Sequence, residues 1–356
     1  MSKPSFSSRL DFSSTVLYTD AGMNTVRKIW ENGNITHSRP HLAQKTRFDE
    51  PLSLHTTFKI GGPADVWVEP ETADDLAAII DFAHGERIPV SVIGGGSNLV
   101  VSDAGIRGIT VSLACFNTVR RTAEGVQAGA GIMMNDLGAW CASHGLSGIE
   151  RFAGLPGNVG GAVFMNARCY EISVSDVFLG AECLYFADGR CTITNKEFLP
   201  GEWAYKRSPF QGGRSCDPLV VADGTVLVLS AGFRVQPGDP AAITAAMSGW
   251  VSDRESRGHF RYPSAGSAFK NNHAFGKPSG KIIDEAGLRG FRIGDAQVAP
   301  WHGNFIINAG AASASDVLAL VTEIRTRVRA VTGFELEPEI LFVGEGFDGL
   351  QGIREN

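Results

Sequence analysis

The sequence lacks several features that mark common classes of protein. Its 356 residues carry a net charge of −6, so it has no excess of positive charge of the kind that nucleic-acid-binding proteins use. It contains no apolar run of about 18 residues and no secretory leader. We therefore expect a globular protein with no nucleic-acid partner and no membrane span, located in the cytoplasm.

Paired cysteines are also missing. None of the six cysteines stands at C-x-x-C spacing from another, which argues against a zinc site or a redox motif. They are Cys115, Cys141, Cys169, Cys183, Cys191 and Cys216. We expect free thiols in a reducing compartment, each behaving as a small buried apolar residue, and no bound metal.

Repeats and low-complexity segments are absent, whereas glycine is abundant. The 43 glycines exceed the usual ~7% and lie dispersed among apolar runs, which indicates many tight turns rather than disorder. Three of them are consecutive and follow a short apolar run, 88–93, that predicts a buried strand.

This triple-glycine stretch is the most informative local signal. Glycine allows positive φ and a close approach of the backbone, and successive N–H groups in such a turn form a concave anion site. The candidate phosphate-binding residues are Gly94, Gly95, Gly96, Ser97 and Asn98. Leu99–Val101 continues as an apolar strand and no Gly-Lys-Ser/Thr follows, so neither common nucleotide-binding motif applies. Taken alone, the stretch is equally compatible with a plain turn.

A second glycine cluster occupies residues 153–162. Proline and glycine alternate there, so backbone amides are again presented in a tight, fixed shape. The candidate cofactor-binding residues are Gly154, Pro156, Gly157, Val159 and Gly160. Two such clusters could clamp one elongated ligand, although a single cluster is more often a turn.

Periodicity and capping residues predict the elements around these clusters. Residues 1–45 look like a poorly ordered lead-in with one short helix near 23–30, and Met23 is an alternative start to Met1. An α/β unit is expected to begin at residue 51. It contains a strand at 64–68 and a helix that Thr72 caps and that ends at Gly85.

The later elements are predicted in the same way. A helix is expected at 136–144 with Asn135 as its cap, a hairpin at 184–193 with an Asp-Gly turn, and a strand pair at 220–235. Asp239-Pro240 should start a helix that runs to about residue 257. Residues 316–331 should form a helix that Gly333 ends, with Val331 on its apolar face, before a strand at 339–343.

Ordered motifs along the chain resemble those of the UDP-N-acetylenolpyruvoylglucosamine reductase (MurB) family. The N-terminal half contributes His55–Asp65, Gly94–Asn98, Pro156–Ala162 and Met165–Ala167. The C-terminal half contributes Ser264–Asn271, Gly294–Val298, His302–Asn308 and Leu336–Ile340. The resemblance covers about residues 51–344.

The resemblance implies a fold and a reaction. The fold is α+β: a two-part FAD-binding domain of the PCMH/vanillyl-alcohol-oxidase type, at 46–112 and 113–236, and a C-terminal UDP-sugar domain at 237–356. NADPH would reduce the FAD. Hydride would then pass to C3 of UDP-N-acetylglucosamine enolpyruvate, and protonation at C2 would give UDP-N-acetylmuramate. An oxidoreductase of this kind serves peptidoglycan synthesis, and so cell shape and division.

The same resemblance suggests roles for individual residues. Ser267 matches the general acid that protonates C2, and Glu339 matches a glutamate that orients or assists this acid. The residues that match substrate contacts are Tyr205, Asn271 and Gln297. Outside the family context, each would more simply be a turn hydroxyl, a surface carboxylate or a loop cap.

Two positions depart from the family pattern. The family has Tyr-Arg-x-Ser-x-Phe, whose arginine stabilises the enolate, whereas this chain reads Tyr205-Lys206-Arg207-Ser208-Pro209-Phe210. Alignment favours Lys206 as the active-site cation and chemistry favours Arg207, because lysine lacks the bidentate fork. Neighbouring residues of an extended segment point to opposite sides, so only one should face the site. Leu341 replaces a frequent arginine, so any contact from that arginine is absent.

Several questions stay open at this point. The FAD should be bound non-covalently, because Gly94–Asn98 contains neither His nor Cys. The protein should be a monomer or a weak oligomer. An oxidase on the same flavin fold and a non-catalytic UDP-sugar or flavin binding module are the alternative functions.

Overall fold

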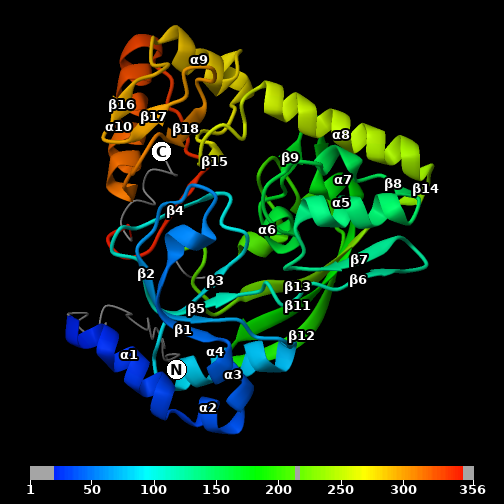
Figure 1. The fold of residues 1–356 in the computed structure, drawn as a ribbon, viewed down its shortest axis with the longest axis vertical. Coiled ribbons are helices and arrows are strands. Elements are labelled where there is room, and N and C mark those ends of the chain that lie inside the picture. Colours follow the sequence, from blue (N-terminus) through cyan, green and yellow to red (C-terminus); the bar gives the residue numbers. More distant parts are fainter. Residues whose placement is uncertain (1–19, 213–216, 348–356) are drawn as a thin grey trace, which may run out of the picture.

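The computed structural model describes residues 20–212 and 217–347, in which three larger sheets of four, five and four strands follow one another along the chain, beside three two-stranded sheets (Figure 1). The N-terminal helices lie at one end of the molecule and the C-terminal sheet with its helices at the other. No helix in these two ranges has the length and apolar character needed to cross a bilayer.

The first sheet has the order β1-β2-β5-β3, with β2 and β3 both parallel to β5. Its strands are β1 (Thr46–Pro51), β2 (Pro63–Val68), β3 (Val90–Ile93) and β5 (Ile106–Ser112). Helix α4 (Ala73–Gly85) begins where Thr72 accepts a hydrogen bond from the Asp75 N–H, and it buries Leu76, Ile79 and Ile80. The predicted cap and apolar stripe of this helix are confirmed.

The expectation of a poorly ordered lead-in to residue 45 is wrong for residues 20–44, whereas the short helix expected near 23–30 is confirmed. This segment forms α1 (Asp20–Asn32), α2 (Asn34–Ser38) and α3 (Pro40–Gln44). The helices bury Trp30 and Leu42 in the same core as α4, and Arg39 forms an ion pair with Asp75 at 2.6 Å. Tertiary burial of a few apolar residues therefore outweighs the polar composition. Residues 1–19, including Met1, lie outside the described residues.

The second sheet is antiparallel with the order β12-β11-β13-β7-β6. Its strands are β6 (Val119–Arg121), β7 (Val126–Gly129), β11 (Phe178–Ala187), β12 (Arg190–Glu197) and β13 (Thr225–Phe233). The predicted Asp-Gly hairpin joins β11 to β12, and Asp188 and Gly189 both have positive φ, as a type I′ turn requires.

Two local predictions in this region are wrong. Residues 220–235 contain one long strand, β13, rather than a pair, because β13 finds its partners in β11 and β7. Helix α5 (Met134–Ser143) starts earlier than expected, with Met133 as its N-cap. The Asn135 side chain accepts a hydrogen bond from the Gly154 N–H instead.

The C-terminal sheet is antiparallel with the order β15-β18-β17-β16. Its strands are β15 (Ser264–Ser267), β16 (Arg292–Ile293), β17 (Ala296–Val298) and β18 (Phe305–Asn308). The helices of this part are α8 (Pro240–Ser256), α9 (Ser279–Glu285) and α10 (Ala314–Thr332). Asp239 caps α8 and Gly333 ends α10 as predicted, but Val331 is 70% exposed and does not belong to the buried face of α10.

Two features connect these parts. Helix α8, which the sequence assigns to the C-terminal domain, packs against α5 of the second part. Strand β19 (Leu341–Val343) pairs in parallel with β4 (Leu99–Val101), the strand that follows the triple glycine. The end of the described chain therefore lies directly beside the first glycine cluster, while the division into domains stays a prediction.

Candidate active site

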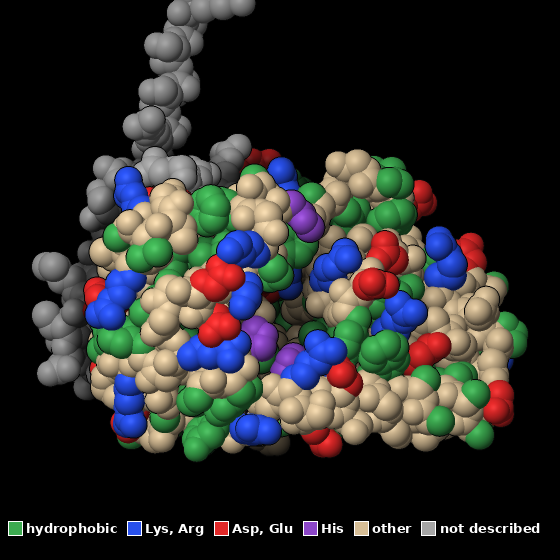
Figure 2. Space-filling model, turned by 90° about the horizontal axis from the view of Figure 1, so that it is seen from above, with side chains coloured by type: hydrophobic (Ala, Val, Ile, Leu, Met, Phe, Trp, Pro, Cys, Tyr) green, Lys and Arg blue, Asp and Glu red, His purple; other side chains and the backbone are tan. Residues whose placement is uncertain are grey.

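A cavity of about 960 Å³ is bounded by both glycine clusters, by the loop that follows α8 and by the start of the C-terminal sheet. Figure 2 shows a hollow in the surface with basic and histidine side chains around it. The volume lies at the upper end of the range usual for ligand sites. An extended ligand can therefore contact all three sheets.

The first glycine cluster forms the cavity wall between β3 and β4. Among the described residues, the backbone N–H groups of Gly94–Asn98 have no protein acceptor. Gly96 has a φ of +60°, and a Cβ atom there would lie 2.0 Å from the His55 carbonyl oxygen. Unused N–H groups in a turn that only glycine can adopt make a concave anion site, so this loop fits the pyrophosphate of FAD.

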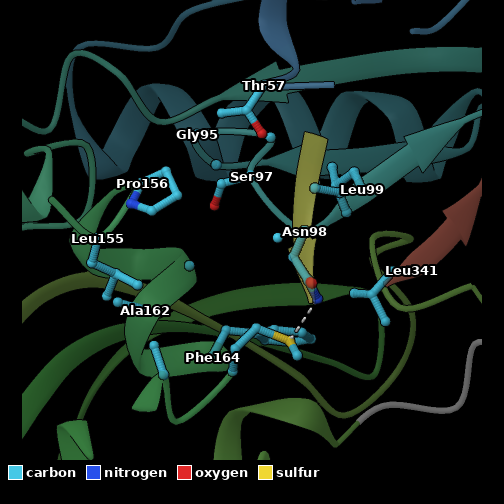
Figure 3. Close-up of a pocket in the computed structure, with 18 of the residues that line it drawn as sticks. Thr57, Gly95, Ser97, Asn98, Leu99, Leu155, Pro156, Ala162, Phe164 and Leu341 are labelled. Atoms are coloured by element: carbon cyan, nitrogen blue, oxygen red, sulfur yellow. Dashed lines mark hydrogen bonds between the residues drawn. The ribbon is translucent and has the colours of Figure 1, made fainter. Parts of the chain in front are cut away.

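Asn98 joins this loop to the opposite end of the chain. Its Nδ2 donates to the Glu339 carbonyl oxygen at 3.1 Å, and its carbonyl oxygen accepts from the Leu341 N–H at 2.9 Å. The amide also approaches the Met165 sulfur at 3.8 Å, as Figure 3 shows. The loop that fits the cofactor therefore fixes the position of Glu339 as well.

The second glycine cluster uses its N–H groups differently. Asn158 caps the short helix α6 (Val159–Phe164) by accepting from the Gly161 N–H at 3.1 Å. The N–H groups of Val159 and Gly160 donate to Ile132 and Ala130. The polar groups of this cluster are therefore largely satisfied by the protein, with little left for a ligand.

The two clusters nevertheless lie against each other. Gly157 has a φ of +102°, and a Cβ atom there would lie 2.5 Å from Ser97 Oγ. Figure 3 shows Gly95, Ser97 and Asn98 near Leu155 and Pro156 in one cavity. Of the predicted cofactor residues in this cluster, Pro156, Gly157 and Gly160 line the cavity, whereas Gly154 and the fully buried Val159 do not.

The end of α6 positions the segment in which Lys206 stands where the family has an arginine. Asn166 Nδ2 donates to the Ala204 carbonyl oxygen at 2.9 Å, and Ser208 Oγ donates to the Phe164 carbonyl oxygen at 2.7 Å. Between these anchors, Ala204 and Arg207 exchange backbone hydrogen bonds and close a tight turn. Lys206 sits in this turn with a φ of +57°.

A positive φ is uncommon for a lysine and costs free energy, so the surrounding anchors must hold it. The turn also explains which of the two cations enters the site. Lys206 lines the cavity, whereas Arg207 is exposed and is not among the lining residues. The expectation that only one of them faces the site agrees with this placement, but the reason is a turn and not an extended segment.

Lys206 and Glu339 meet as an ion pair inside the cavity. The distance between Lys206 Nζ and Glu339 Oε1 is 2.5 Å, and the two side chains are only 14% and 10% exposed. Burial raises the pKa of the Glu339 carboxyl above its ordinary value, and the positive charge of Lys206 opposes this rise. The two charged groups are therefore largely shielded from water, and a polar ligand in the cavity could form hydrogen bonds with them.

The remaining candidates separate into two groups. Ser267, at the end of β15, and Asn271 both line the cavity. The Glu339 N–H donates to the carbonyl oxygen of Ala268, the residue after Ser267, at 2.8 Å. The Tyr205 hydroxyl accepts a long hydrogen bond from the Asn271 N–H at 3.5 Å, although Tyr205 itself does not line the cavity.

Gln297 is a further candidate that does not line the cavity. Its amide donates to the Gly290 carbonyl oxygen at 3.0 Å from within β17, and it is not among the residues that line the cavity. The interactions that sequence reasoning missed are those of Asn166 and Ser208. A signal was available for Asn166, whose φ is +41°, because asparagine is enriched in this conformation.

Comparisons with known proteins agree with this geometry. Residues 64–195 match the model of a FAD binding domain, and residues 258–343 match that of the UDP-N-acetylenolpyruvoylglucosamine reductase C-terminal domain. The fold class predicted from the sequence, an α+β chain with a FAD-binding part and a MurB-type C-terminal domain, is thereby confirmed.

Whole-chain relatives extend the match. A UDP-N-acetylenolpyruvoylglucosamine reductase of Treponema denticola is 44% identical over 318 residues, covering 88% of this chain and 98% of the relative. The Treponema pallidum reductase is also 44% identical, over 87% of this chain and 97% of the relative. The crystal structure of the Thermus caldophilus reductase superposes with a TM-score of 0.62 at 32% identity, over 83% of this chain and 97% of that one. At this identity and coverage, the chain belongs to the UDP-N-acetylenolpyruvoylglucosamine reductase family.

Proposed function

We propose that this chain reduces UDP-N-acetylglucosamine enolpyruvate to UDP-N-acetylmuramate, with NADPH as reductant and FAD as bound cofactor. The observation that carries the proposal is the buried Lys206–Glu339 pair, held by both glycine clusters in the cavity that also contains Ser267. The reaction belongs to peptidoglycan synthesis, and its soluble substrates would place the protein in the cytoplasm. We expect a monomer or a weak oligomer.

Lys206 acts on the charge that develops during the reaction. An ammonium group has three N–H donors, and Glu339 uses one of them, so two remain for a ligand in the cavity. Addition of hydride at C3 leaves negative charge on C2 and on the attached carboxylate. A preorganised cation in a site shielded from water stabilises such charge strongly. Arg207, which is exposed, has no such role.

Glu339 positions this cation and tunes its surroundings. The carboxylate fixes Lys206 Nζ at 2.5 Å, while Asn98 holds the Glu339 backbone. Because burial raises its pKa, Glu339 also accepts a proton more readily than an exposed glutamate does. It can thus assist a neighbouring proton donor.

Ser267 donates the proton to C2. A serine hydroxyl is a weak acid, but the enolate-like carbon that it protonates is strongly basic, so the transfer need not be uphill. Ser267 lines the cavity, and its neighbour Ala268 holds the Glu339 N–H. Asn271 lies in the same wall and contributes an amide for substrate binding.

The loop Gly94–Asn98 would hold the pyrophosphate of FAD through its unused N–H groups. Bound FAD supplies hydride transfer between NADPH and the substrate. We assign no covalent bond between FAD and a residue that lines the cavity, and we propose that FAD is bound non-covalently. Gln297 is left out of the proposed substrate site, since its amide is used by Gly290.

The test is a two-step anaerobic titration of the purified flavoprotein, followed by absorbance. NADPH should bleach the flavin, and the colour should return on addition of UDP-N-acetylglucosamine enolpyruvate but only slowly in air. Return of the colour at the same rate in air alone would indicate an oxidase instead. A protein that binds the UDP-sugar without any return of colour would be a binding module.

A further inference from the structure

The wall of the cavity that α8 and the following loop provide contains a buried guanidinium with no acidic partner. Arg254 is only 9% exposed, and no Asp or Glu within residues 20–212 and 217–347 forms an ion pair with it. The carboxylate next to it in sequence, Asp253, is engaged by Arg257 at 2.9 Å and by the Tyr170 hydroxyl at 2.8 Å. A buried charge without a counter-charge is costly to keep.

The contacts that Arg254 does make are weak substitutes for an anion. Its Nη2 donates to Cys169 Sγ at 2.6 Å, and its Nη1 lies 3.5 Å from Nδ1 of His259. The Tyr170 ring lies 5.5 Å from the guanidinium carbon. The Nε atom is buried and has no partner among the described residues. A guanidinium has five N–H donors, so the Nη1 and Nη2 groups retain N–H donors that no acidic group uses.

The chain makes room for this side chain at a residue that the sequence assigned to the cofactor. Gly154 has a φ of +72°, and a Cβ atom there would lie 2.9 Å from Arg254 Cδ. The glycine therefore accommodates the arginine. This accounts for a member of the second glycine cluster that does not line the cavity.

The neighbours of Arg254 leave its charge uncompensated. Burial, and then the positive charge of Arg254, lower the pKa of His259 to about 4. Burial likewise lowers the pKa of His302. Both imidazoles are therefore neutral at pH 7. Arg257 and Arg261 line the same wall with exposed side chains.

Aromatic side chains accompany the positive charge. Arg254 lies in the last turn of α8, and Phe260 and Tyr262 lie in the loop that follows this helix; both line the cavity and are 50% and 46% exposed. A planar base can stack on such rings while an adjoining phosphate reaches the guanidinium. The combination fits a nucleoside diphosphate better than a small carboxylate.

We propose that Arg254 binds a phosphate group of a nucleoside diphosphate ligand, through the bidentate geometry that guanidinium and phosphate share. The naming of the ligand rests on the proposed function, which supplies two sources of this chemistry: the UDP group of the sugar substrate and the phosphates of NADPH. The pyrophosphate of FAD has its own site in Gly94–Asn98.

Isothermal titration of the FAD-loaded protein with UDP and, separately, with 2′,5′-ADP tests the proposal without any turnover. In Arg254→Gln, at least one of these ligands should bind ~10–100-fold more weakly, because a hydrogen bond to a charged group contributes ~1.5–3 kcal/mol. The control Arg327→Gln removes an exposed cation of α10 that does not line the cavity and should leave both affinities within ~2-fold of the wild type. Weaker UDP binding identifies the substrate as the source, and weaker 2′,5′-ADP binding identifies NADPH.

A second variant separates binding from folding. Arg254→Met removes the buried charge and keeps the length of the side chain, so the ligand-free protein should unfold at an unchanged or higher temperature. It should also lose the rise in unfolding temperature that the ligand causes in the wild type. A lower unfolding temperature with unchanged affinity for both probes would overturn the proposal and make Arg254 a structural residue. Since neither measurement needs catalysis, failure of the reductase assay would leave this result standing.

Discussion

The two glycine clusters look alike in the sequence but do different work in the structure. In Gly94–Asn98, the described residues offer no acceptor to the backbone N–H groups, and the loop is left able to bind an anion. In the cluster around Asn158, the N–H groups of Val159, Gly160 and Gly161 are satisfied by the protein. The second cluster instead starts α6, and Phe164 at the end of α6 and Asn166 just after it hold the turn that carries Lys206.

The comparison shows that glycine content alone does not identify a ligand site. Glycine permits both close approach and unusual φ, and either property can serve a ligand or the packing of the chain. The number of N–H groups left without a protein partner distinguishes the two cases. On this criterion we propose that the first cluster binds the cofactor and that the second positions the proposed catalytic side chains.

The strongest test of the comparison substitutes one glycine in each cluster. Gly95→Val should abolish retention of FAD, because even a Cβ atom at Gly95 would lie 2.9 Å from Gly157 Cα. Gly161→Ala is the matched control, since its Cβ would meet only Asn158 Oδ1, at 3.1 Å. The ratio of flavin to protein absorbance measures the outcome. A fully loaded Gly95→Val variant would contradict the assignment of the first cluster.

The next effect in size concerns Ser267, the proposed proton donor. Ser267→Ala should leave flavin reduction by NADPH near the wild-type rate, because that step needs no proton at C2. Reoxidation by the enolpyruvyl substrate should slow by ~10²–10⁴-fold, the usual contribution of a positioned general acid. Stopped-flow absorbance of each half-reaction provides the measurement. Equal slowing of both halves would mean that Ser267 supports the fold or the flavin.

Lys206→Ala should slow the same oxidative half-reaction by ~10²–10³-fold, by analogy with the loss of one preorganised donor to an oxyanion. Arg207→Ala is the neighbouring control and should be nearly neutral, because Arg207 is exposed outside the cavity. Single-turnover rates with pre-reduced enzyme distinguish the two variants. A severe Arg207 variant with a mild Lys206 variant would reverse the assignment.

The smallest effect is expected for Asn166, because it contributes only by holding the turn that carries Lys206. Asn166→Asp keeps an oxygen that can accept from the Ser175 N–H but removes the amide donor to the Ala204 carbonyl oxygen. The Lys206 turn should lose its anchor, and the oxidative half-reaction should slow by ~10-fold, since small misplacements of a catalytic group are costly. FAD content should not change. Loss of flavin from this variant would contradict the assignment of separate roles to the two clusters.

The sequence predicted those elements that short-range rules determine. Thr72 caps α4, the Asp188-Gly189 turn closes a hairpin, and Gly333 ends α10, because each depends on residues only a few positions apart. The family motifs likewise predicted the candidates Ser267 and Glu339, which line the same cavity, with the Glu339 N–H bonded to Ala268. Their roles stay proposals.

Long-range contacts explain what could not be predicted. The N-terminal helices depend on burial of Trp30 against core residues that lie much later in the sequence. The choice between Lys206 and Arg207 depends on a turn that two long-range hydrogen bonds hold in place. Asn166 donates to the turn, and Ser208 attaches the turn to the end of α6. Gly154 matches a cofactor motif, yet its positive φ and missing Cβ make room for Arg254.

A double-mutant cycle between Asn166 and Lys206 tests the central claim most directly, namely that the second cluster acts through Lys206 and the first through the cofactor. The oxidative half-reaction is measured for Asn166→Asp, Lys206→Ala and the double variant, with FAD content determined for each. If Asn166 acts only by positioning Lys206, the double variant should be no slower than Lys206→Ala alone, and all three should retain FAD. Multiplicative slowing, or loss of FAD from Asn166→Asp, would contradict the account.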